Sequence, residues 1–241
     1  MRKVRWTLGN FVHLTRRVVR GLPMAPTDEE KDRHLLELFY MNDSHSNSKV
    51  MRDVLGQISS GSLALYEWPT SWPKRDPITR LCAFCLNYNH DHNIAVEIVE
   101  GGISKFMHDT GISKAKYHNE KYGDKGSFFQ GPYDARVIES DKYLRWVIPY
   151  VMCKNTFEMH PRGYDWCKNN FDEAWEWSIH YPYSSLGVYA GIFESPIIDP
   201  NPLREIVGSP NAFYKLCRDM IDGRKVDKDI LSLDIDSLSF E

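Results

Sequence analysis

The sequence predicts an α+β fold with two layers, an antiparallel sheet that carries helices on one face. Three observations predict this class. Runs of β-branched or alternating side chains mark strands, amphipathic runs between them mark helices, and a short polar turn joins two consecutive strands into a hairpin. The order strand, helix, hairpin, helix, strand, helix suits one sheet covered by helices.

The first strand and the first helix have the clearest signals. Residues 11–19, Phe-Val-His-Leu-Thr-Arg-Arg-Val-Val, are rich in β-branched side chains and favour a strand. Thr27 is a good N-cap, and the acids at 28–30 complement the dipole of a helix expected to end at about Met41.

Residues 42–77 are expected to form an irregular insertion after this helix. Residues 42–49 are rich in Ser and Asn, which is typical of a loop. Residues 50–60 favour a short helix, whereas three prolines within 68–77 exclude regular structure there.

The rest of the chain completes the sheet and adds helices. The elements expected are strands over 78–86, 90–99 and 128–138, and helices over 103–122 and 139–148, the former interrupted at Gly111. This succession is that of ferredoxin-like and RRM-like sheets. Residues 164–241 are expected to form a helical C-terminal extension, which prolines divide into short pieces.

Composition indicates a globular protein without a membrane span. The 241 residues are 42% hydrophobic, enough for one core with extensions. No apolar run approaches the ~18 residues of a spanning helix, and residues 1–6 lack the apolar stretch of a secretory signal. Five scattered cysteines argue against a disulfide framework, so a cytoplasmic location is expected. Cys82 and Cys85 form a lone CxxC and are interpreted as core residues, since a structural zinc site needs four ligands.

The charge is unevenly distributed, although the net value is only -3. Residues 1–27 hold six basic residues and no acid, whereas acids are frequent after residue 226. Local potential rather than total charge attracts a polyanion, so a basic N-terminal face could meet phosphates. A solvated charged face is the alternative.

The segment Asn89-His-Asp-His-Asn93 carries the most specific chemistry. Side chains two apart on a strand project to the same face, so His90 and His92 would share one side while Asp91 faces away. Two imidazoles held in this way suit a divalent cation. Histidines that are merely exposed or hydrogen-bonded are the alternative.

Several segments resemble one protein family in their order and spacing. The segments are Asn89-His-Asp-His92 with Ile94-Ala-Val-Glu97, Gly102-Ile-Ser-Lys-Phe-Met107, Asn119-Glu-Lys-Tyr-Gly123, Gly126-Ser-Phe-Phe-Gln-Gly131, Glu139-Ser-Asp-Lys-Tyr-Leu144 and Tyr181-Pro-Tyr-Ser-Ser185. Together with the first strand, they resemble the single-tyrosine HUH transposases, particularly the REP-associated tyrosine transposases. The resemblance covers nearly the whole chain.

The resemblance implies cleavage of single-stranded DNA without a nucleotide cofactor. His90 and His92 would hold Mg²⁺ or Mn²⁺, and a tyrosine would attack the scissile phosphate to give a 5′-phosphotyrosine bond and a free 3′-hydroxyl. The Tyr-Ile-x-x-Asn block of the family falls on Tyr150-Val-Met-Cys-Lys154, which makes Tyr150 the expected nucleophile. Tyr117 is the reserve candidate.

Three departures from the family pattern are informative. Asp91 replaces an apolar residue, so it must be solvated or must bond a helix N-terminus or a cation. Lys154 stands where the family places an amide or acid. Either local unwinding brings Asn155 round as the third metal ligand, which we favour, or Lys154 itself meets the phosphate. Pro149 predicts a kink or a fresh helix start directly before Tyr150.

The expected DNA contacts are basic side chains and exposed aromatic rings. The phosphate contacts expected are Arg16, Arg17, Arg20, Lys114, Lys116 and Lys154. Trp68 and Trp72 could stack on unpaired bases. For the lysines the alternative is a solvated surface, and for the tryptophans a place in the core.

These interpretations give three functional hypotheses. The first is an HUH single-tyrosine nuclease domain over residues 1–163, acting on single-stranded or hairpin DNA as a monomer or homodimer. The second is a domesticated protein that binds hairpin DNA and cleaves it weakly or not at all. The third is a metallohydrolase that activates water, with Glu97 or Asp91 as its general base.

Overall fold

The computed structural model describes residues 6–47 and 49–223, and the predicted basic residues 2–5 and the acidic C-terminal end lie outside the described residues. Four strands form one antiparallel sheet in the order β2-β3-β1-β4. The strands are β1 (Phe11–Arg17), β2 (Thr79–Leu86), β3 (His90–Glu97) and β4 (Asp134–Val137). The α+β class and the β2–β3 hairpin are therefore confirmed.

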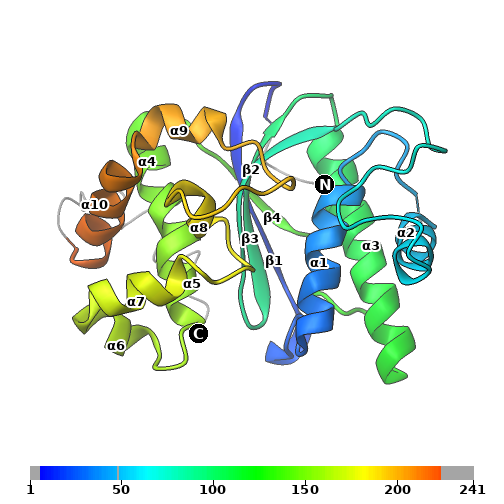
Figure 1. Ribbon diagram of the computed structural model, residues 1–241, viewed down its shortest axis with the longest axis horizontal. Coiled ribbons are helices and arrows are strands. Elements are labelled where there is room, and N and C mark those ends of the chain that lie inside the picture. The colour runs from blue at the N-terminus through cyan, green and yellow to red at the C-terminus, as the bar shows by residue number, and fades with distance from the viewer. Residues whose placement is uncertain (1–5, 48, 224–241) are drawn as a thin grey trace.

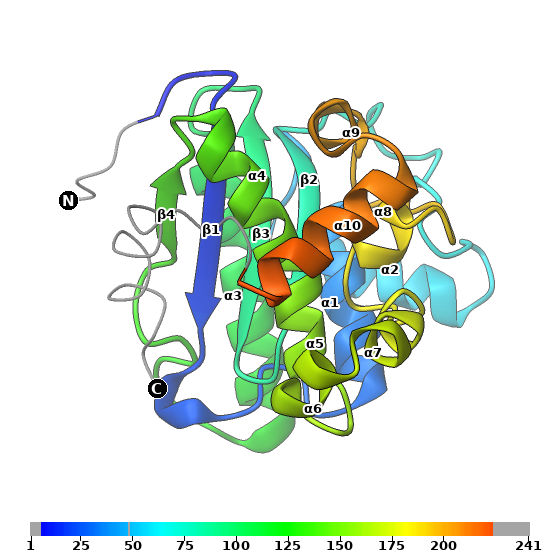
Figure 2. The same ribbon diagram turned by 90° about the vertical axis from the view of Figure 1, so that its left-hand side faces the viewer.

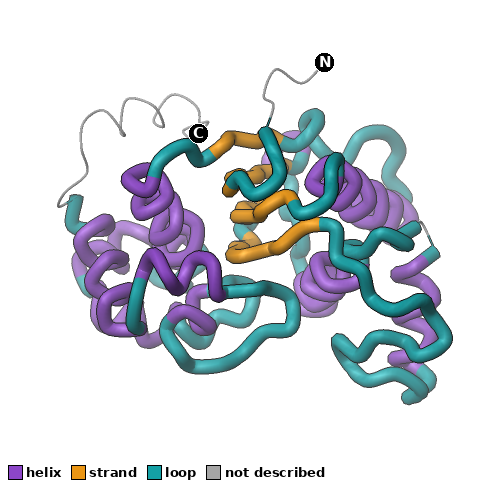
Figure 3. Tube along the Cα trace, turned by 90° about the horizontal axis from the view of Figure 1, so that it is seen from above, coloured by secondary structure: helices purple, strands orange, loops and turns teal. Residues whose placement is uncertain are grey.

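Helices cover both faces of the sheet (Figure 1). On one face lie α1 (Asp28–Tyr40) and α3 (Gly102–Tyr122), with α2 (Val50–Ser59) beside them. On the other face lie α4 (Asp141–Pro149), the π-helical turn η2 (Tyr150–Lys154) and α5 (Asn155–Glu158). Seen from above, the strands lie between two groups of helices (Figure 3). The expectation of helices on one face is wrong, because Val147, Ile148 and Val151 need an apolar partner and bury themselves completely in this second layer.

Residues 164–223, the described part of the predicted C-terminal extension, are helical as predicted and pack outside α4 and α5 (Figure 2). Its helices are α6 (Tyr164–Asn169), α7 (Phe171–Ser178), α8 (Leu186–Tyr189), α9 (Asn201–Val207) and α10 (Pro210–Ile221). Between α7 and α8 the chain pairs with the edge of β2. The N–H of Leu86 donates to the carbonyl of Tyr183 (2.9 Å), and the N–H of Ser185 donates to the carbonyl of Phe84 (2.9 Å). This pairing covers an edge that would otherwise expose unpaired backbone groups.

The capping and cysteine predictions agree with the structure. Thr27 caps α1 in a capping box with Glu30, whose side chain accepts from the Thr27 N–H. A short helix, α2, lies in the insertion, where the three-proline segment is irregular. All five cysteines are buried free thiols, and Cys82 and Cys85 are core residues of β2.

Two predicted details are wrong. The helix α3 continues through Gly111 without an interruption. The glycine has a packing role instead, because a Cβ there would lie 3.1 Å from Nη1 of the buried Arg16. The last strand spans Asp134–Val137 only, and of the earlier part Phe129 forms just an isolated bridge with Val18. A 3₁₀ turn, η1 (Val19–Gly21), follows β1.

Candidate functional site

His90 and His92 lie together on the sheet face that α4, η2 and α5 cover. Their ring centroids are 4.8 Å apart and the rings are nearly perpendicular. Strand alternation turns Asp91 to the opposite face, where it meets Arg16 of β1. The expected pairing of the two imidazoles on one side of β3 is therefore present.

A third imidazole belongs to this group, and the sequence reasoning missed it. His13 of β1 places Nε2 2.9 Å from Nδ1 of His92, and Oγ1 of Thr15 lies 3.1 Å from the same atom. Both contacts follow from the register, since Thr15 pairs directly with His92 and His13 with Ile94. Nδ1 of His92 is thus engaged, whereas its Nε2 is buried and has no hydrogen-bond partner in the structure.

Burial keeps these imidazoles neutral. Burial, and then the charge of Arg136, lowers the pKa of His13 to about 3. Burial, and then Arg17 and Lys154, lowers the pKa of His90 to about 3. The pKa of His92 is lowered well below its usual value, by burial first and then by the other imidazoles and the same two cations. Neutral imidazole is the form that binds a metal ion or accepts a hydrogen bond.

Tyr150 lies over this group. Its ring centroid is 5.5 Å from that of His92 and 6.2 Å from that of His13, edge-on in both cases. On its other side it stacks on Trp146, with centroids 4.9 Å apart, and only 8% of the residue is exposed. The expected nucleophile and the expected ligands therefore meet on one face of the sheet.

A π turn follows Pro149 and changes which side chain stands one turn after Tyr150. The N–H of Asn155 donates to the carbonyl of Tyr150, five residues earlier. Because a π turn holds more residues than an α turn, Asn155 is brought round toward the face of Tyr150. The helical backbone continues through Pro149 into the π turn, so the structure has a change of helix type after Pro149 where a kink or a fresh helix start was predicted. This π turn is the local unwinding that the sequence analysis considered for Asn155.

Asn155 and Lys154 are held by Asn87, which directly follows β2, and by Glu158 of α5. Asn155 is fully buried; Nδ2 of Asn87 donates to its Oδ1 (3.4 Å), while its own Nδ2 has no partner in the structure. Nζ of Lys154 lies 5.1 Å from the Tyr150 ring centroid and pairs with Glu158. Nδ2 of Asn87 also donates to Glu158 (3.0 Å). The ammonium group of Lys154 therefore lies beside the ring of Tyr150, and the amide of Asn155 is buried beside Asn87.

The group offers imidazole nitrogens for a metal ion, and Asn155 is the residue that would add an amide oxygen. Within residues 6–47 and 49–223, no set of three or more His, Cys, Asp or Glu side chains is arranged to hold one. An Asn ligand falls outside that set of residue types. The unpartnered Nε2 of buried His92 is the observation that fits a ligand role, because a buried polar atom without a partner is costly.

Two expected DNA contacts are wrong for this fold. Arg16 is 4% exposed on the opposite face, where it pairs with Asp91 (3.0 Å) and donates to Thr110. Lys114 is 2% exposed and donates to the carbonyl of Glu30. Neither group can reach a phosphate without opening the core. Of the three environments expected for Asp91, the structure shows the bond to a cation, which is Arg16.

The other expected contacts have different places. Arg17 lies on the histidine side of β1, paired in register with His90, and Arg20 is exposed just beyond the strand. Lys154 adjoins Tyr150. Lys116 is exposed, but it belongs to α3 on the opposite face.

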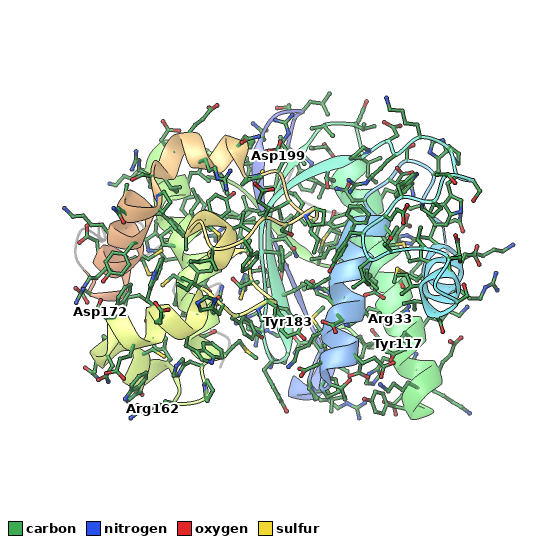
Figure 4. All side chains as sticks on the ribbon, viewed as in Figure 1. Arg33, Tyr117, Arg162, Asp172, Tyr183 and Asp199 are labelled. Atoms are coloured by element: carbon green, nitrogen blue, oxygen red, sulfur yellow. The ribbon has the colours of Figure 1, made fainter. Side chains whose placement is uncertain are left out.

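The reserve nucleophile and the proposed general bases also lie on the opposite face. Tyr117 lies beside Arg33, whose guanidinium carbon is 4.4 Å from its ring centroid, between α1 and α3 (Figure 4). Oε1 of Glu97 accepts from the N–H of Ile103 at the start of α3. Glu97 and Asp91 cannot activate a water at His90 and His92, so the hydrolase hypothesis loses both of its bases.

The fold and this geometry define an α+β protein with a buried cluster of neutral imidazoles beneath a tyrosine. No family model matches the chain, no curated protein matches it, and no solved structure matches it. None of the helices in the described ranges has both the length and the apolar character needed to cross a membrane.

Proposed function

We propose that this protein is a metal-dependent, single-strand-specific DNA endonuclease and strand transferase of the HUH type. It cleaves DNA near hairpins through a covalent bond to Tyr150. One observation carries the proposal: the ring of Tyr150 lies 5.5 Å from that of His92, on the sheet face that also holds His90. A nucleophile and two candidate ligands could therefore contact the same phosphodiester.

The strand order supports the finer description of the fold. The order β4-β1-β3-β2 with an antiparallel hairpin between the two helices is that expected of a ferredoxin-like sheet. Such a sheet presents its central strands, here β1 and β3, to the layer above. The site would then use the middle of the sheet, where the backbone is held most firmly.

His90, His92 and Asn155 are the residues that would hold the cation. When bound, Mg²⁺ or Mn²⁺ would polarise the phosphoryl oxygen and offset its developing charge. Mn²⁺ suits this set better than Mg²⁺, because Mg²⁺ prefers oxygen ligands and two of the three donors are imidazoles. His13 and Thr15 would fix the ring of His92 so that Nε2 faces the ligand.

The chain's own residues account for the transfer step. Oη of Tyr150 forms a bond to phosphorus and loses its proton, while the bond from phosphorus to the 3′ oxygen breaks and that oxygen gains a proton. Arg17 and Lys154, whose charges act on His90 and His92, would attract the phosphate. Reversal of the step with another 3′-hydroxyl rejoins the strand without ATP, because the phosphoester bond is retained.

Trapping of the adduct tests the proposal. The protein is incubated with an end-labelled hairpin oligonucleotide that carries a single-stranded flank, with Mn²⁺ or with a chelator, and analysed on a denaturing gel. We expect a protein-linked label that needs Mn²⁺ and disappears in Tyr150→Phe. The matched control is Tyr164→Phe, which removes a hydroxyl from a ring 5.9 Å from the same Lys154. An adduct that persists in Tyr150→Phe would contradict the nucleophile assignment.

The binding protein without strong cleavage remains the second candidate function. The pairing of Lys154 with Glu158 favours it, because an ammonium group stands close to where the third ligand would be. In that case the hairpin is retarded on a native gel and no adduct forms with either cation. Cleavage without an adduct would instead indicate attack by water.

A further inference from the structure

A pocket of about 300 Å³ lies on the far side of the molecule from Tyr150. The irregular insertion builds it, together with the last residue of α1 and the first turn of α2. The lining residues are Tyr40, Asp43, His45, Ser46, Asn47, Val50, Asp53, Trp68, Trp72 and Pro73. Neither the cleavage chemistry nor the sheet requires this pocket.

Three aromatic rings form one wall of the pocket. Trp68 and Trp72 are perpendicular with centroids 5.3 Å apart, and Tyr40 stacks on Trp68 at 6.0 Å. Hydrogen bonds fix two of the rings: the hydroxyl of Tyr40 donates to the carbonyl of Glu67 (2.8 Å), and Nε1 of Trp68 donates to the carbonyl of Pro73 (2.8 Å). The rings therefore form a corner whose shape does not depend on a ligand.

The charges of the lining are negative. The lining residues include the carboxylates of Asp43 and Asp53 and no Lys or Arg, although Asp53 also pairs with Arg52 next to it (3.3 Å). Asp43 is buried, and its carboxylate accepts hydrogen bonds from the N–H groups of His45 and Asp76. The nearby cation Lys105 is engaged with Asp109 at 2.6 Å.

The aromatic cluster already contacts one cation, Arg75. The guanidinium carbon of Arg75 lies 4.0 Å from the ring centroid of Phe39 and 5.9 Å from that of Trp68. Aromatic faces attract cations through their quadrupole, and the attraction is strongest for Trp. Rigid aromatic walls combined with carboxylates are the arrangement that recognises alkylammonium groups.

We infer that this pocket binds a compact alkylammonium group, of the kind carried by choline or by a methylated lysine side chain. A nucleobase would also stack on Trp68 and Trp72, as the sequence analysis considered. A base carries a phosphate with it, however. The lining offers two carboxylates, and the adjacent cations Arg52 and Lys105 already pair with Asp53 and Asp109. The charge of the pocket therefore favours the cation.

Titration with matched ligands tests the inference. The probes are choline, its uncharged isostere 3,3-dimethyl-1-butanol, trimethyllysine and thymidine 5′-monophosphate. The seven tryptophans give separate indole N–H signals in ¹H–¹⁵N spectra of the full chain, and Trp68→Phe and Trp72→Phe assign the relevant two. We expect choline to move these two signals, and the isostere to bind about tenfold more weakly. A stronger response to trimethyllysine than to choline would identify a lysine side chain as the source of the group.

Variants of the pocket complete the test. Trp72→Leu should weaken choline binding about tenfold. Asp53→Asn, which alters a half-exposed side chain and leaves the core intact, should weaken it about threefold. Asp165→Asn, an exposed acid on α6, is the control. Equal binding of the uncharged isostere, movement of the signals by the nucleotide alone, or no movement at all would overturn the inference. Adduct formation by Tyr150 should be unchanged in Asp53→Asn, so the two proposals fail independently.

Discussion

The two faces of the sheet use the same strands for different purposes. On the face under α1 and α3, charged groups meet opposite charges: Arg16 pairs with Asp91 at 3.0 Å, and Arg33 pairs with Glu37 at 3.3 Å. On the face under α4 and η2, His90 and His92 are neutral and the charges that act on them come from cations. Adjacent residues of one strand, Arg16 and Arg17, belong to different faces.

One face of β1 therefore contributes mainly to stability, and its other face contributes to the candidate site. Both faces hold buried polar atoms without a partner among the described residues. The buried ion pair of Arg16 and Asp91 lies on the α1/α3 face, whereas the pair of Lys154 and Glu158 on the other face is partly exposed.

On the α4/η2 face, a protonated imidazole would stand buried beside the charges of Arg17 and Lys154, so this face is stable only while His90 and His92 are neutral. A bound cation together with a phosphate would satisfy both the neutral imidazoles and the two basic side chains. The predictions below test whether the two faces are as separate as their contacts indicate.

The largest expected effect is on stability, from the paired face. Asp91→Ala leaves Arg16 buried without its partner, which should lower the free energy of unfolding by about 3–5 kcal/mol. Chemical denaturation measures this loss. The double variant Arg16→Met with Asp91→Leu should be less destabilised than the single variant, because it leaves no unpaired charge.

The same double variant tests whether the Arg16–Asp91 pair affects the candidate site on the other face. In the Arg16→Met and Asp91→Leu double variant, Mn²⁺-dependent adduct formation should remain near its original level. Loss of the adduct in a stably folded double variant would show that the Arg16–Asp91 pair also positions His90 and His92 through β3.

The second effect concerns the positioning residue His13. His13→Phe removes one of the two contacts with Nδ1 of His92 and leaves Thr15 alone to orient that ring, so Mn²⁺ affinity should fall about 10- to 100-fold. Calorimetric titration with Mn²⁺ measures it. His34→Phe is the matched control, since His34 is equally buried but contacts Asp91 on the other face. Equal losses in the two variants would mean that folding, not positioning, accounts for the change.

The sequence predicted the elements and the pair of imidazoles well because both depend on local periodicity. The capping box of Thr27, the hairpin and the shared side of His90 and His92 follow from the spacing of neighbouring residues. Alternation along the first strand also carried a signal that was not used: it assigns His13, Thr15 and Arg17 to one face and Arg16 to the other. That signal would have corrected the prediction for Arg16.

The missing parts of the site depend on non-local register. His13 joins His92 only because Thr15 pairs with His92, and a shift of one residue would put every side chain on the wrong face. The burial of Lys114 depends on how α3 packs, and the second helical layer depends on where the chain turns after β4. The position of Asn155 depends on a π turn, which single-residue propensities do not reveal.

The third effect is a pH dependence of stability. The pKa values of His13 and His90 are lowered to about 3 in the folded protein, whereas an unfolded histidine has a pKa of about 6.5. Between these values the unfolded chain binds protons that the folded protein excludes, so stability is full above pH 6.5 and falls as the pH drops toward 3. Each imidazole contributes about 1.4 kcal/mol per pH unit at most. Denaturation measured between pH 7 and pH 4.5 should show a smaller loss of the free energy of unfolding in His13→Phe than in the original protein. An equal loss in both proteins would contradict burial of a neutral His13.

The smallest effect compares two helical glycines. A Cβ at Gly56 of α2 would meet nothing within 4 Å, so Gly56→Ala should raise the free energy of unfolding by about 0.5–1 kcal/mol. A Cβ at Gly111 of α3 would lie 3.1 Å from Nη1 of Arg16, which is fixed by Asp91, Thr110 and the ring of Phe129. Gly111→Ala should therefore give no such gain. A gain equal to that of Gly56→Ala, measured by denaturation, would mean that Arg16 can move aside and that the paired face is less rigid than its contacts indicate.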